Sequence, residues 1–303
     1  MLEVGFTNRL EKVSSEIAKQ IAATQSESAR HALAYRRFEE TFLDSYYLIP
    51  NIQRVIRSVY DQNGNPVQGI ATNIYNNTAN NLFQSYLFIR DRDLKPITQH
   101  DIDELKAGSK SMSLETASRN FVKQCFERAY NEANLFAKIF GIEPHWSADE
   151  ASAFAVLKSQ QRSLINPANL TPLATNLQVV LQAAELKTVC AVVGWLAHEY
   201  LLLDYDDDES SFVRYYRELS ARLLTESLWP FTDAAFEAEL TKTISKTVIA
   251  NNTLKIGPVV GAVSSSNAYP PVKKALHLLS MFDQAMPKER SVRTSKLFET
   301  CAL

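Results

Sequence analysis

The densest group of ligand-type side chains is the acidic run Asp-Tyr-Asp-Asp-Asp-Glu that begins at Asp204. Hard cations such as Ca²⁺ and Mg²⁺ bind several carboxylates at once, and Asp204, Asp206 and Asp208 have the spacing that opens an EF-hand loop. The rest of the loop does not fit, because Glu209 replaces the required glycine and Tyr215 replaces the bidentate glutamate. We therefore expect a solvated loop between helices, with a Mg²⁺- or Ca²⁺-dependent activity as a third functional alternative.

Other side chains with catalytic potential are isolated along the chain. His198 and Glu199 resemble the start of a zinc-protease helix, but Leu202 occupies the position of the second histidine. Cys190 lies two helical turns from His198, about 12 Å along a helix axis, which is too far for a thiolate–imidazole pair. The sequence also lacks a nucleophile elbow, a Walker loop and a dinucleotide-binding fingerprint. These patterns predict a protein that is not an enzyme and has no cofactor.

Basic residues occur in two clusters, and aromatic residues are interleaved with the first of them. Cations bind phosphates and aromatic faces stack on bases, so a groove for single-stranded RNA is one use of such residues. An ordinary charged surface is the alternative, because acidic residues lie among the first cluster. The candidate nucleic-acid-binding residues are Arg30, Arg36, Arg37, Arg54, Arg57, Lys273, Lys274, Lys288, Arg290 and Arg293.

The composition predicts an all-α fold. The chain has only 8 glycines in 303 residues, whereas average usage would give roughly 20, and apolar residues recur at helical spacing almost throughout. The net charge of −2 excludes a global basic field. Three widely separated cysteines and the absence of a signal-peptide pattern favour an intracellular, cytoplasmic setting, and we expect no membrane span.

The N-terminal segment predicts an amphipathic helical arm with an apolar stripe formed by Leu10, Val13, Ile17 and Ile21. Such an arm packs either on its own core or on a partner, and these four residues are the candidate partner-binding set. Residues 55–67 then contain alternating apolar residues and an Asn-Gly pair, which indicates either a short β-hairpin or a helix interrupted by a loop.

Two helical lobes are predicted, an N-terminal lobe over residues 1–166 and a C-terminal lobe over residues 167–303 with a basic tail. The boundary is placed at the Asn- and Pro-containing stretch before Thr171. The segment from Val189 to Ala197 is hydrophobic on all sides, so we expect a buried helix at the centre of the C-terminal lobe. Gly141 is expected to end a long helix as its C-cap glycine.

The leading functional interpretation is a non-enzymatic helical scaffold or assembly protein whose partner is another protein, itself or a larger assembly. The alternative is an RNA-coating protein of the nucleocapsid type, which rests on architectural analogy. Convergence of the two basic clusters on one groove favours the second interpretation. An exposed apolar patch on the arm favours the first.

Overall fold

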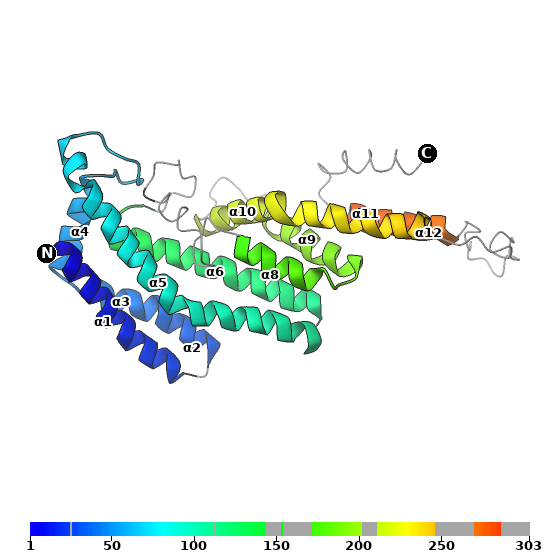
Figure 1. The fold of residues 1–303 in the computed structure, drawn as a ribbon, viewed down its shortest axis with the longest axis horizontal. Helices are drawn as coiled ribbons and strands as arrows, with labels where there is room; N and C mark the ends of the chain where they lie inside the picture. Colours follow the sequence, from blue (N-terminus) through cyan, green and yellow to red (C-terminus); the bar gives the residue numbers. More distant parts are fainter. Residues whose placement is uncertain are drawn as a thin grey trace, which may run out of the picture. The chain divides into compact units, whose positions relative to one another are not determined.

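A computed structural model describes residues 1–24, 26–111, 113–143, 153, 171–201, 211–245 and 270–285. Within these ranges all the regular elements are helices, and the all-α prediction is confirmed (Figure 1). The chain forms two compact units. The first contains the described residues of 1–107, 120–173 and 214–219, and the second contains those of 108–119, 174–213 and 220–303. The boundary predicted at 166/167 lies outside the described residues, and the two units alternate along the sequence.

The first unit is built from an N-terminal group of short helices and two long ones. A π-helical turn, η1, joins α2 to α3 without a break in the helix. Helices α5 and α6 each continue into the second unit. The elements are α1 (Leu2–Ala22), α2 (Glu27–Ala32), η1 (Leu33–Arg37), α3 (Phe38–Leu43), α4 (Leu48–Arg57), α5 (Ile70–Ser111) and α6 (Leu114–Phe140).

Aromatic side chains form much of the core of the first unit. Phe83 of α5 lies at the centre, with ring centroids 4.7 Å from Phe140 and 5.1 Å from Phe136 of α6. Phe6 of α1 joins the same cluster through Phe140, with centroids 5.8 Å apart, and makes an edge contact with Phe42 of α3 at 5.7 Å. Buried rings of this size dominate core energetics, so these contacts hold α1, α3, α5 and α6 together.

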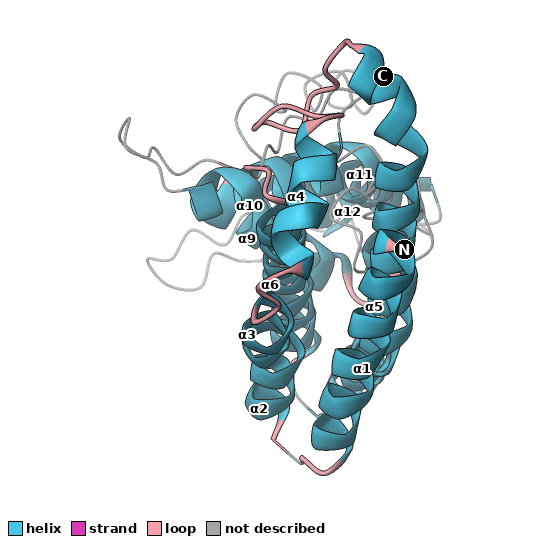
Figure 2. Ribbon diagram, turned by 90° about the vertical axis from the view of Figure 1, so that its left-hand side faces the viewer, coloured by secondary structure: helices cyan, strands magenta, loops and turns pink. Residues whose placement is uncertain are grey.

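The apolar stripe of α1 is used inside its own unit. Leu10 and Val13 are completely buried, Ile17 is 4% exposed, and Ile21 packs partly buried against the core. Helix α1 runs beside α5 in Figures 1 and 2, in the same direction. The prediction that these four residues bind a partner is therefore corrected. Packing this stripe on a neighbouring helix of the same chain avoids the entropy cost of associating with a separate molecule. The N-terminal helix is therefore part of the core of its own unit.

The segment predicted as either a hairpin or an interrupted helix is the end of a helix followed by a tight turn, and the hairpin prediction is not confirmed. Helix α4 extends to Arg57, and a single antiparallel bridge then links Tyr60 to Pro66. Gly64 has a φ of 77°, which the turn requires. Asp61 accepts hydrogen bonds from the backbone N–H groups of Asn63 and Asn65 at 2.9 and 2.8 Å. These local bonds use the donors that a longer ladder would need, so no strand forms here.

Helix α6 ends as the sequence predicts. Gly141 follows its last residue with a φ of +67°, a conformation that other residues adopt only with strain. The side chain of Gln53 donates hydrogen bonds to the carbonyls of Lys138 and Ile139 at 3.1 and 3.4 Å. These bonds satisfy two of the carbonyl groups that a helix end leaves without a partner.

The second unit is also helical. Helix α9 buries most of its residues between Val189 and Ala197, in agreement with the predicted buried helix. Phe236 of α11 stacks on Phe282 of α12 with centroids 4.3 Å apart. The π-helical turn η2 lies just before Pro230, where proline removes a helical hydrogen bond. The elements are α8 (Thr171–Leu181), α9 (Leu186–Tyr200), α10 (Ser211–Leu223), η2 (Leu224–Leu228), α11 (Trp229–Ser245) and α12 (Pro270–Ala285), of which residues 171–173 of α8 and 214–219 of α10 belong to the first unit.

Candidate functional site

A network of buried charges links α5 to α6 in the first unit. Arg90 donates from Nε and Nη2 to the carboxylate of Glu132 at 3.1 and 2.8 Å, and the hydroxyl of Tyr86 donates to the same carboxylate at 2.6 Å. The Arg90 side chain is 2% exposed and that of Glu132 is 0% exposed. The guanidinium also lies over the ring of Phe38 at 4.3 Å. Burial raises the pKa of Tyr86 well above its usual value, and the nearby Glu132 charge raises it further. The Tyr86 hydroxyl therefore stays protonated.

A second buried pair lies further along the same two helices. The guanidinium of Arg128 on α6 donates to the carboxylate of Asp101 on α5, and its other terminal nitrogen lies 3.4 Å from the sulfur of Cys125. Burial raises the pKa of Asp101, and the Arg128 charge opposes that rise. Burial also raises the pKa of the Cys125 thiol to about 11, so the thiol is protonated and inert at neutral pH.

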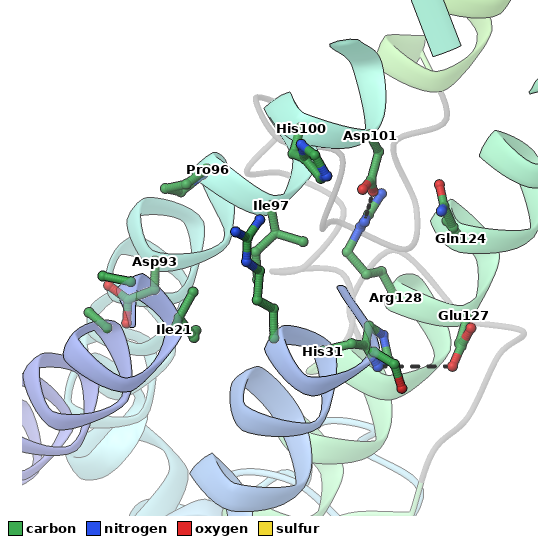
Figure 3. A pocket seen from close by; sticks show the side chains of 14 residues that line it. Ile21, His31, Asp93, Pro96, Ile97, His100, Asp101, Gln124, Glu127 and Arg128 are labelled. Atoms are coloured by element: carbon green, nitrogen blue, oxygen red, sulfur yellow. Dashed lines mark hydrogen bonds and ion pairs between the residues drawn. The ribbon is translucent and has the colours of Figure 1, made fainter. Parts of the chain in front are cut away.

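A cavity of about 520 Å³ opens beside the second pair, where the end of α1 and the start of α2 face α5 and α6. Figure 3 shows Ile21, Pro96 and Ile97 along one wall, and His31 with Arg128 at another. His31 Nδ1 lies 3.9 Å from Glu127 Oε1. Burial lowers the pKa of His31, although the Glu127 charge acts in the opposite direction. The cavity therefore combines an apolar wall with a mixed-charge wall.

Charged side chains that line this cavity already have partners in the same unit. Asp101 is bound by Arg128, Asp93 accepts from Arg92 at 3.1 Å, and Arg30 donates to the backbone carbonyl of Thr24 at 2.9 Å. No group of three His, Cys, Asp or Glu residues in the described part of the chain could hold a metal ion. The arrangement is suited to holding four helices in register. It does not assemble a nucleophile with a base.

The predicted basic residues occupy ordinary surface positions where the structure describes them. Arg36 and Arg37 both pair with Glu40, at 3.2 and 3.6 Å. Arg54 and Arg57 are exposed in the last turns of α4, and Arg57 borders a smaller cavity of about 340 Å³. Within the second unit, Lys273 is exposed and Lys274 lies 4.0 Å from Glu239. Three further candidates lie outside the described residues: Lys288, Arg290 and Arg293.

The acidic run also falls outside the described residues, so the metal site at Asp204, Asp206 and Asp208 stays a prediction. In the described part of the chain, none of the helices is both long and apolar enough to cross a bilayer.

The sequence analysis missed one surface, an exposed stripe on α5. Ile70 and Ile74 are 82% and 64% exposed, and Phe88 is 68% exposed. We call the stripe the neutral face of α5. No charged residue or histidine occurs between positions 62 and 89, a signal that charge patterning alone could have revealed. The neutral face consists of Ile70, Ile74, Asn77, Asn81, Gln84 and Phe88, all of them exposed.

Comparison with protein families finds a match over most of the chain. Residues 31–302 match the family described as "Conserved oligomeric Golgi complex subunit 3, C-terminal". The chain belongs to this family. Comparison with curated proteins and with solved structures finds no match.

Membership of this family favours one of the two leading functional interpretations. The family is described as a subunit of an oligomeric complex, so a role in protein assembly fits and an RNA-coating role receives no support. The match begins at residue 31 and therefore leaves out α1, although α1 supplies Phe6 and Leu10 to the core of the first unit. In this chain, the core of the first unit therefore extends beyond the N-terminal end of the segment that matches the family.

Proposed function

We propose that this protein is a structural subunit of a Golgi-associated oligomeric complex, and that it acts in the cell interior by holding other proteins through its helical surfaces. The family match over residues 31–302 carries the proposal. The structure supports it through two helical units and through an exposed apolar and amide surface on α5. Catalysis is not part of this function.

In this proposal, the role of the buried charges is to hold helices α5 and α6 in a fixed arrangement. Arg90 with Glu132 and Arg128 with Asp101 fix the register of α5 against α6, because a shifted helix would leave a buried ion without its partner. A fixed register gives the outer surfaces of these helices one defined arrangement. A subunit that binds several partners requires such a surface, since preorganisation reduces the entropy cost of each contact.

The experiment that tests the proposal is co-expression with the other subunits of the Golgi complex from the same organism. Size-exclusion chromatography with light scattering should show the protein in a particle of defined mass together with those subunits. The ratio of absorbance at 260 and 280 nm should stay at the value of a nucleic-acid-free protein and should not change with ribonuclease. Elution of the protein alone, with the other subunits assembled without it, would contradict the proposal.

A further inference from the structure

The neutral face of α5 has the geometry of a helix-pairing seam. Its six residues are spaced four, three, four, three and four positions apart, so they lie on one side of the helix. From Ile70 to Phe88 the seam is about 27 Å long, at 1.5 Å per residue. The buried residues of the same helix, such as Phe83 and Tyr86, face the core of the first unit. The seam therefore faces away from the core.

The composition of this face differs from that of other exposed helix faces in the same unit. The exposed side of α1 carries Glu11, Lys12 and Lys19, as a solvated surface normally does. None of the six residues of the neutral face is charged, and its two ends are apolar, with Ile70 and Ile74 at one end and Phe88 at the other. Near its middle, the Asn81 side chain donates a hydrogen bond to the Glu3 carboxylate of α1 at 3.3 Å. Depletion of charge combined with exposed aromatic and aliphatic residues is the compositional mark of the centre of a protein interface.

Building on the proposed function, we infer that the neutral face binds an α-helix of another subunit, and that the contacting face of that helix is uncharged. A charged residue on the partner would lose its hydration against Ile74, Asn77 or Gln84 without gaining an opposite charge. Apolar residues fit the two ends of the seam. Amide or hydroxyl groups fit its centre, where they exchange hydrogen bonds with the asparagine and glutamine side chains.

The size of the face favours a partner in the complex over a second copy of this chain. A seam about 27 Å long on helices about 10 Å wide buries on the order of 600 Å² in total, whereas stable interfaces bury about 1,200–2,000 Å². The seam alone is therefore too small to hold a dimer. In a complex, other contacts keep the partner nearby, so a small seam is sufficient because the effective local concentration is high.

Site-specific crosslinking in the reconstituted complex tests this inference. A photo-crosslinking amino acid is placed at position 74 or 88, and at position 47 as a control, because Tyr47 is 89% exposed but lies outside the face. We expect crosslinks from positions 74 and 88, but not from 47, to a helix of another subunit with an uncharged face. Crosslinks to a second copy of this chain, no crosslinks, or equal yields at 47 and 74 would overturn the inference.

Charge insertion gives an independent readout. Ile74→Lys and Gln84→Lys change exposed side chains, so helicity measured by circular dichroism should equal that of the wild type. We expect each variant to lower incorporation into the complex at least tenfold, and the control Tyr47→Lys to change it less than twofold. Incorporation of both seam variants at the wild-type level would overturn the inference while leaving the proposed function intact. Failure of the wild type itself to assemble would instead refute the proposed function.

Discussion

Replacing Glu132 by glutamine tests whether the buried network is held by charge. The substitution keeps the shape of the side chain but leaves the guanidinium of Arg90, which is 2% exposed, without an opposite charge. Breaking a buried pair by removing one partner costs about 3–5 kcal/mol. The amide oxygen of glutamine still accepts a hydrogen bond, so we expect Glu132→Gln to lower the free energy of unfolding of the first unit by about 3 kcal/mol.

A triple substitution separates the cost of a broken network from the value of the intact one. Tyr86→Phe, Arg90→Met and Glu132→Leu together remove both charges and the hydroxyl group, so no buried polar atom of the network is left without a partner. Replacing a whole buried ion pair by apolar residues of similar volume is often neutral or stabilising. We expect the triple variant to lie within about 2 kcal/mol of the wild type, and therefore to be more stable than the single variant.

The assay is urea unfolding followed by circular dichroism, with Glu11→Gln as the matched control. Glu11 accepts two hydrogen bonds from Arg92 at 3.0 and 2.9 Å, but both side chains are 47% exposed. An exposed pair of this kind contributes about 0–1 kcal/mol. A cost of Glu132→Gln as small as that of Glu11→Gln would refute the reasoning. So would a triple variant that is far less stable than the single one.

Three further predictions concern the first unit and are measured by the same unfolding assay. Gly141→Ala should destabilise it by at least about 1 kcal/mol, because alanine at a φ of +67° is strained and its Cβ would lie 2.8 Å from the side chain of Gln53; an unchanged midpoint would contradict this. Leu10→Ala should cost about 2–5 kcal/mol, because the side chain is completely buried; a cost below about 1 kcal/mol would place α1 outside the core. Burial lowers the pKa of His31 in the folded state, so the unfolded chain binds its proton more tightly, and stability is lost as the pH falls below the unfolded value of 6.5. When the pH is lowered from 7.5 to 5.5, the urea midpoint of unfolding of His31→Gln should therefore fall less than that of the wild type. Equal falls would exclude His31 as the cause of the loss of stability at low pH.

Several parts of the candidate sites could not be predicted from the sequence because they depend on which helices meet. Arg90 and Glu132 look like ordinary helix charges, and their burial follows only from the side-by-side packing of α5 and α6. The same is true of the 520 Å³ cavity, which is formed by side chains from four helices. Local spacing gives the side of a helix on which a residue lies, but not the element that covers that side.

The sequence by itself determined the helical class, the C-cap at Gly141 and the buried character of α9, because these depend on glycine content, local backbone conformation and uniform hydrophobicity. Tertiary structure decided how two similar apolar stripes are used. Leu10 of α1 is covered by the core of its own unit, whereas Ile74 of α5 is exposed. Both positions satisfy the same helical spacing rule, and the difference arises because the core of the first unit covers one stripe and leaves the first turns of α5 open to solvent.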